Sequence, residues 1–119
     1  MCVADKFAVI CLDSIRNENE RLMITGNITG SGKEIISISL EQMNAFAGNM
    51  LQVKNSKDEL LLVMSSLAFG SLNKTQVSKL EKFSRIIHTP LDTIESCGGG
   101  SARCMMAEIF NKNSKHISF

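Results

Sequence analysis

The residues best suited to chemistry in this chain are a cysteine and a run of three glycines just before it. Gly98, Gly99 and Gly100 precede Cys104, and Arg103 stands directly beside the cysteine. Because glycine has no Cβ, such a run can adopt positive φ and let a substrate approach main-chain N–H groups. A thiol reacts as its thiolate, and a neighbouring cation lowers the thiol pKa. The pattern suits a cysteine nucleophile, but a glycine-rich turn leading into a buried strand, with Cys104 as a small apolar residue, is the commoner arrangement.

The overall composition excludes several classes of partner. The 119 residues carry a formal net charge of +1, with 13 Lys and Arg against 12 Asp and Glu, so no basic surface for nucleic acid or anionic lipid is indicated. No apolar run approaches the roughly 18 to 20 residues of a membrane-spanning helix, and the first residues lack a secretion signal. We therefore expect a cytoplasmic protein that binds neither nucleic acid nor membranes.

The cysteines and histidines do not form a metal-binding pattern. Four cysteines occur without a Cys-x-x-Cys pair, and the two histidines lie far apart in the sequence. Seven methionines and the missing secretion signal argue against a disulfide scaffold. Reduced thiols, no metal and no cofactor are expected.

Strands and helices alternate along the chain in an order typical of an α+β fold. Strands are predicted near residues 7–11, 35–38, 50–53, 60–64 and 105–110, helices near 17–28, 39–46 and 73–87, and an extended segment at 91–95. The pairs Ser39 with Gln42 and Asn73 with Gln76 form capping boxes, which mark the starts of two of these helices. Residues 1–110 are interpreted as one domain and 111–119 as a polar tail.

The segment Glu95-Ser-Cys-Gly-Gly-Gly-Ser-Ala-Arg-Cys-Met-Met-Ala-Glu-Ile-Phe110 resembles the C-terminal nucleophile motif of the guanidino-group-modifying enzymes. It resembles in particular the citrulline-utilisation hydrolase branch, whose members are relatives of arginine deiminase and the amidinotransferases. Residues 38–51, 63–65 and 72–80 resemble the same branch in the same order, so that the likeness extends from Cys2 to about Phe110. It implies a partial pentein α/β propeller, with about two of the five ββαβ units that such a fold repeats.

The resemblance also implies roles for individual residues. Cys104 would attack the guanidinium carbon of an arginine-like substrate and form a thiouronium intermediate, which water hydrolyses or another amine accepts. The three glycines would form the substrate loop. Asn49 and Arg103 would hold that loop in place, although Gly48 and Asn49 could equally form a helix C-cap.

In the family the catalytic histidine lies in a stretch ahead of the segment that matches Met1. Neither His88 nor His116 is expected to replace it, so we expect the chain alone to be inactive. Four acidic residues are interpreted as solvated carboxylates rather than guanidinium ligands: Asp5, Asp13, Asp92 and Glu95. Asp92 and Glu95 could instead support the glycine-rich loop.

Two hypotheses of different kinds follow. In the first, Cys104 completes an active site together with a chain that carries the missing N-terminal units. In the second, the chain is a non-catalytic remnant or scaffold with an intact nucleophile loop. Within the first, the likeness favours hydrolysis to citrulline and ammonia over amidino transfer, while the substrate stays open.

Overall fold

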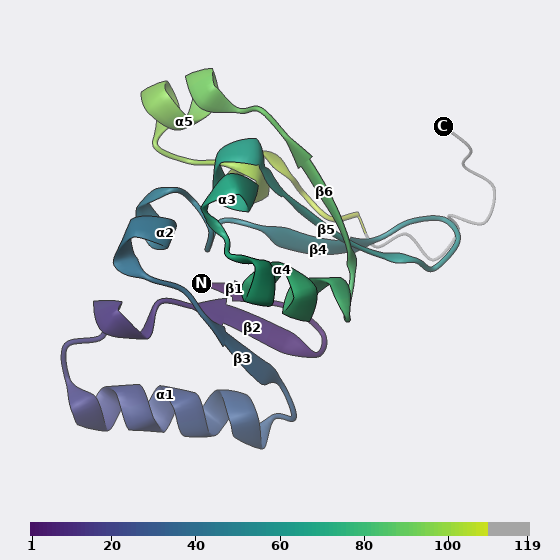
Figure 1. Cartoon of the computed structure of the whole chain (residues 1–119). Coiled ribbons are helices and arrows are strands. Elements are labelled where there is room, and N and C mark those ends of the chain that lie inside the picture. The colour runs from purple at the N-terminus through teal and green to yellow at the C-terminus, as the bar shows by residue number, and fades with distance from the viewer. Residues whose placement is uncertain (110–119) are drawn as a thin grey trace.

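The computed structural model describes residues 1–109 and contains two three-stranded sheets with helices around them (Figure 1). In the first sheet the order is β1 (Cys2–Val3), β2 (Phe7–Ile10), β3 (Glu34–Ser37). The central strand β2 pairs antiparallel with β1 and parallel with β3. All four residues of β2 are buried, as expected of an apolar strand covered on both faces.

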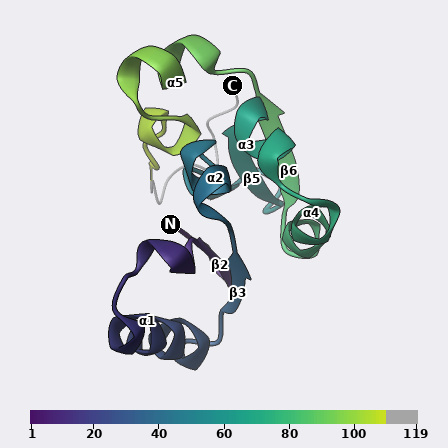
Figure 2. The ribbon, with the colours of Figure 1, turned by 60° about the vertical axis from the view of Figure 1, so that its left-hand side comes forward.

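A helical crossover joins the two parallel strands of this first sheet. After a short 3-10 turn, η1 (Leu12–Ser14), the helix α1 (Glu18–Gly30) begins where the Asn17 side chain accepts hydrogen bonds from two main-chain N–H groups. The exit from α1 passes through Gly32, whose φ of +80° is a conformation that favours glycine. In Figures 1 and 2, α1 lies beside this sheet, away from the second one.

The second sheet repeats this arrangement. Strands β4 (Leu51–Lys54) and β5 (Leu60–Ser65) form an antiparallel hairpin, and β6 (Arg85–Thr89) pairs parallel to β5. The helices α3 (Ser66–Ser71) and α4 (Lys74–Glu81) form the crossover from β5 to β6. A short helix α2 (Leu40–Asn44) connects the two sheets, while α5 (Asp92–Gly98) and the 3-10 turn η2 (Ala102–Met105) follow the last strand.

One continuous hydrophobic core joins the two sheets. Phe7 and Val9 of β2 belong to the same buried cluster as Leu62 of β5 and Leu80 of α4. The rings of Phe7 and Phe83 lie 5.2 Å apart between centroids, which fixes the loop after α4 against the first sheet. The two halves of the chain therefore share one core.

Two glutamines near the starts of helices α2 and α4 join the two halves of the chain through hydrogen bonds. Gln42 in α2 and Gln76 in α4 are the third helical residues of the two capping boxes, both of which form. Their amides also exchange hydrogen bonds, from Gln42 Nε2 to Gln76 Oε1 at 2.6 Å and from Gln76 Nε2 to Gln42 Oε1 at 3.0 Å. Gln42 Nε2 donates further to the Ser71 carbonyl, and Gln76 Nε2 to the Ser37 carbonyl, both at 2.8 Å.

The structure confirms the α+β class, the strands near 7–11 and 35–38, the first helix and the hairpin, and it corrects three segments. Residues 85–89, predicted as the end of an amphipathic helix, form strand β6, because α4 ends at Glu81 and the segment pairs with β5. Residues 92–98 form helix α5 rather than an extended segment. Residues 105–109 form no strand, and the boundary proposed between residues 110 and 111 lies outside the described residues.

None of the helices in residues 1–109 combines the length and the apolar character that crossing a lipid bilayer requires.

Candidate functional site

Cys104 lies on the surface, in the 3-10 turn η2 that follows the glycine run. Its main-chain N–H donates to the Ser101 carbonyl at 3.1 Å, and η2 packs against β5. The interpretation of Cys104 as a small buried residue entering a strand is therefore wrong. The side chain is open to a reactant.

The three glycines have different structural tasks. Gly98 is the last residue of α5, and no atom outside its neighbourhood lies within 4 Å of the position that a Cβ would take. Gly99 is the C-cap in the left-handed conformation, with φ +67°. At Gly100 a Cβ would lie 3.1 Å from Cys104 Sγ and 3.2 Å from Cys104 Cβ. The loop thus needs Gly99 for its turn and Gly100 for its close approach to the thiol.

Asn49, in the segment between α2 and β4, contacts this loop through its side chain. Its Nδ2 donates to Cys104 Sγ at 3.1 Å, and its Oδ1 accepts from the Arg103 main-chain N–H at 3.0 Å. The C-cap interpretation of Asn49 is wrong, because α2 ends five residues earlier, with Ala45 as its C-cap. One amide therefore contacts both the thiol and the main chain next to it.

The Arg103 guanidinium also holds the loop, through a hydrogen bond from Nη1 to the Met1 carbonyl at 2.8 Å. This contact joins residues 102 positions apart in the sequence. Arg103 therefore ties η2 to the start of the chain, beside the strand β1.

The surroundings of Cys104 favour its thiolate. The hydrogen bond from Asn49 is the largest cause that lowers the pKa of the Cys104 thiol, followed by hydrogen bonding to the Ser101 main chain. The charge of Arg103 acts in the same direction, and partial desolvation opposes it. Burial has the opposite result at Cys2, whose thiol pKa is raised. Low thiol pKa and exposure together are what a reactive cysteine requires.

Two polar side chains at the glycine-rich loop are buried and form a hydrogen bond with each other. Ser101 is fully buried, Glu95 in α5 is 6% exposed, and the Ser101 hydroxyl donates to Glu95 Oε1 at 2.6 Å. The second carboxylate oxygen, Oε2, has no hydrogen-bond partner within the described part of the chain. Sequence reasoning did not single out Ser101, since nothing in its local pattern distinguishes it from other serines.

The other acidic candidates lie apart from this pair. The side chains of Asp5, Asp13 and Asp92 are exposed, in line with solvated carboxylates. Of the four acidic candidates, only Glu95 is both buried and bonded to the glycine-rich loop.

His88 makes its contacts elsewhere on the molecule. Its Nδ1 lies 2.9 Å from the Ser66 hydroxyl, and its ring stacks on Phe69 with centroids 4.2 Å apart. No hydrogen bond between a histidine and Cys104 occurs among residues 1–109, and His116 lies outside them. In that same range no group of three or more histidines, cysteines and acidic residues is placed to hold a metal ion.

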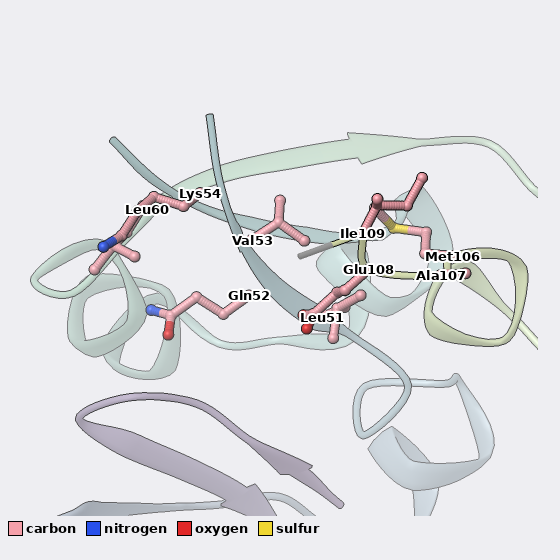
Figure 3. A pocket seen from close by; sticks show the side chains of 9 residues that line it. All are labelled: Leu51, Gln52, Val53, Lys54, Leu60, Met106, Ala107, Glu108 and Ile109. Carbon is pink, nitrogen blue, oxygen red and sulfur yellow. The ribbon is translucent and has the colours of Figure 1, made fainter. Parts of the chain in front are cut away.

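A cavity of about 570 Å³ opens beside strand β4. Figure 3 shows Leu51 and Val53 of this strand together with Met106 and Ile109, which follow η2. Cys104 is not among the residues that line it. The residues that line the cavity therefore include some that directly follow the turn η2, but the cavity does not enclose the Cys104 thiol.

Comparison with known proteins relates the chain to one family. A family model described as N,N dimethylarginine dimethylhydrolase, eukaryotic, matches residues 1–111. Such enzymes are guanidino-group-modifying hydrolases of the pentein superfamily, so the match confirms the resemblance noted in the sequence. No curated protein and no solved structure matches the chain.

Proposed function

Because this chain belongs to the eukaryotic N,N dimethylarginine dimethylhydrolase family, we propose that it supplies the nucleophile of a guanidino-group hydrolase, with Cys104 in that role. The observation that carries this proposal is an exposed thiol to which the Asn49 amide donates at 3.1 Å. That hydrogen bond favours the thiolate, the form that attacks carbon. The family match makes N,N-dimethylarginine the first substrate to test, with arginine second.

The proposed reaction replaces a C–N bond with a C–O bond in two steps. The Cys104 thiolate forms an S–C bond to the guanidinium carbon, and the bond from that carbon to the dimethylamino nitrogen breaks once this nitrogen has accepted a proton. Water then attacks the thiouronium carbon, the S–C bond breaks, and the thiolate is restored. One water is consumed, and citrulline and dimethylamine are formed. Arginine would give citrulline and ammonia by the same route.

Both steps require a group that donates and accepts protons, and we propose that it comes from outside residues 1–109. His88, the one histidine of the described chain, is engaged by Ser66 and Phe69. Cys104 is exposed, whereas hydrolysis through a charged intermediate is favoured at a site that excludes bulk water. Both facts support a site that another chain or segment completes, and they support inactivity of the chain alone.

The repeated topology supports the proposal that the two sheets are two units of a pentein propeller. Each consists of an antiparallel pair, a helical crossover and a third strand parallel to the second. This order, ββαβ, is the order expected of one unit of such a propeller.

Turnover measurements test the proposal directly. The purified 119-residue chain is incubated with N,N-dimethylarginine and with arginine, and citrulline and the released amine are quantified. We expect no more product than Cys104→Ala forms. Turnover that Cys104→Ala abolishes would support the nucleophile and overturn the need for an outside group. Turnover that persists in Cys104→Ala would overturn the nucleophile assignment itself.

Alkylation tests the nucleophile without any turnover. Trypsin cleaves after Arg103, so Cys97 and Cys104 fall in separate peptides, and the iodoacetamide reaction of each can be followed by mass spectrometry. Both thiols are exposed, which makes Cys97 an internal reference. We expect Cys104 to react at lower pH than Cys97. If the midpoint of Cys104 alkylation lay at the same pH as that of Cys97, or at a higher pH, the result would contradict the proposal and favour a non-catalytic remnant.

A further inference from the structure

We propose that Glu95 and Ser101 are positioning residues for Cys104, acting together as a buried pair that holds the glycine-rich loop with its main chain facing the thiol. This inference rests on the proposed role of Cys104 and deepens it. Neither side chain is expected to touch the substrate, because Ser101 is fully buried and Glu95 is 6% exposed.

The first step of the argument is that Glu95 fixes the loop at two points. Its main-chain carbonyl accepts from the Gly99 N–H at 3.2 Å, which closes the end of α5 in the left-handed turn. Its carboxylate accepts from the Ser101 hydroxyl at 2.6 Å. Glu95 therefore determines where the chain runs on both sides of Gly100.

The second step connects Ser101 to the thiol. The Ser101 carbonyl accepts from the Cys104 N–H at 3.1 Å, which starts the turn η2. The Ser101 main chain is also the second-largest cause that lowers the pKa of the Cys104 thiol. Its position depends on the buried hydroxyl, so a change to the Glu95 carboxyl group reaches Cys104 through Ser101.

The third step is the close packing of this loop against Cys104. Gly100 approaches Cys104 so closely that an added Cβ would lie 3.1 Å from Sγ. A shift of a few tenths of an ångström at Gly100 or Ser101 therefore changes the distance to the sulfur. Asn49 holds the turn from the opposite side, through the Arg103 N–H and the thiol itself. The Asn49 amide thus contacts the thiol directly, whereas the buried Glu95 carboxyl group acts on it through Ser101.

The experiment compares the pH profile of Cys104 alkylation in two variants in which an amide replaces the Glu95 carboxyl group. Glu95→Gln keeps an oxygen that can accept from the Ser101 hydroxyl, and Glu95→Gln combined with Ser101→Ala removes that hydrogen bond. Starting from the amide avoids leaving a carboxylate buried without any partner, which would itself unfold the region. Iodoacetamide is the probe, and the tryptic peptides separate Cys104 from Cys97.

We expect Glu95→Gln to keep the Cys104 profile close to that of the parent chain. The double variant should move the profile to higher pH, and a shift of half to one pKa unit slows alkylation at pH 7 about three- to tenfold. Cys97, in the same helix as Glu95 but exposed, should react as before. Asp92→Asn is the matched control, since Asp92 is an exposed carboxylate of the same helix, and it should leave both profiles unchanged.

An unchanged Cys104 profile in the double variant, with Cys97 also unchanged, would overturn the proposal. Faster labelling of both thiols would mean that the pair merely keeps α5 folded, and this would overturn it as well. Ser101→Thr, which restores the hydroxyl in the Glu95→Gln background, should recover the parent profile. Alkylation requires neither substrate nor an outside proton donor, so this experiment can fail while the turnover proposal holds, and the reverse is equally possible.

Discussion

Gln76→Ala should lower the free energy of unfolding by about 1.5–4 kcal/mol, because it removes the amide that joins the two halves of the chain. This side chain donates to the Ser37 carbonyl and to Gln42, and it accepts from Gln42 and from the Asn73 N–H. Leaving a buried polar group one partner short costs about 1–3 kcal/mol. The lost half of the capping box adds about 0.5–1 kcal/mol. Their sum is a large fraction of the stability of a domain of this size, about 5–15 kcal/mol.

Urea and thermal unfolding followed by far-ultraviolet circular dichroism measure this loss. At about 4 °C per kcal/mol for a chain of this length, the midpoint of thermal unfolding should fall by about 6–16 °C. Thr75→Ala is the matched control, because Thr75 is the exposed neighbour in the same helical turn and should change stability by no more than about 0.5 kcal/mol.

A double-mutant cycle with Gln42→Ala separates the contact between the two amides from the other hydrogen bonds of each. Because the amides exchange two hydrogen bonds, the double variant should lose about 1–2 kcal/mol less than the sum of the single losses. A Gln76→Ala chain within 0.5 kcal/mol of the parent, or a double variant that is strictly additive, would refute the idea that the glutamine pair joins the halves.

Two further predictions concern the thiol. Asn49→Ala removes the hydrogen bond that does most to lower the pKa of Cys104, so the alkylation profile should move to higher pH and the rate at pH 7 should fall; an unmoved midpoint would contradict the assigned cause. Gly100→Ala places a methyl group 3.1 Å from the Cys104 sulfur and should displace the sulfur from Asn49. The loss of this hydrogen bond should slow the alkylation of Cys104. Gly98→Ala, where that methyl group would meet nothing within 4 Å, is its control, and equal slowing in both variants would show that the close approach is unimportant.

Features set by hydrogen bonds between near neighbours could be predicted from the sequence. Both capping boxes form as expected, because Ser39 with Gln42 and Asn73 with Gln76 satisfy main-chain N–H groups within one helical turn. The buried strand β2 was equally accessible to prediction, since its four residues are apolar without interruption.

Elements decided by distant partners were not predictable in this way. Ile86 and Ile87 fit the spacing of the preceding helix, yet pairing of β6 with β5 places them in a strand. β-branched residues suit a strand better than a helix, but only the neighbouring β5 makes that preference decisive. The helix α5 carries no local start signal, because its N-cap residue, Leu91, has no side chain that could accept a hydrogen bond from the first turn.

The same division applies to the candidate site. Cys104 and the glycines form a local motif that the sequence displays, whereas the contact of Asn49 with Cys104 spans 55 positions. The burial of Glu95 likewise depends on how α5 packs, and five other positions separate it from Ser101. Contacts that depend on packing require coordinates, since side-chain type alone does not say which carboxylate faces inward.

The position of Met1 has a practical consequence for anyone who prepares this protein. Its carbonyl accepts from the Arg103 guanidinium, and its nitrogen would lie 3.2 Å from a Cβ added at Gly48, next to Asn49. Any residues joined ahead of Met1 therefore leave the fold beside the turn η2, which contains Cys104. An affinity tag at that end would become part of the surroundings of Cys104, and reactivity comparisons among variants are best made after its removal.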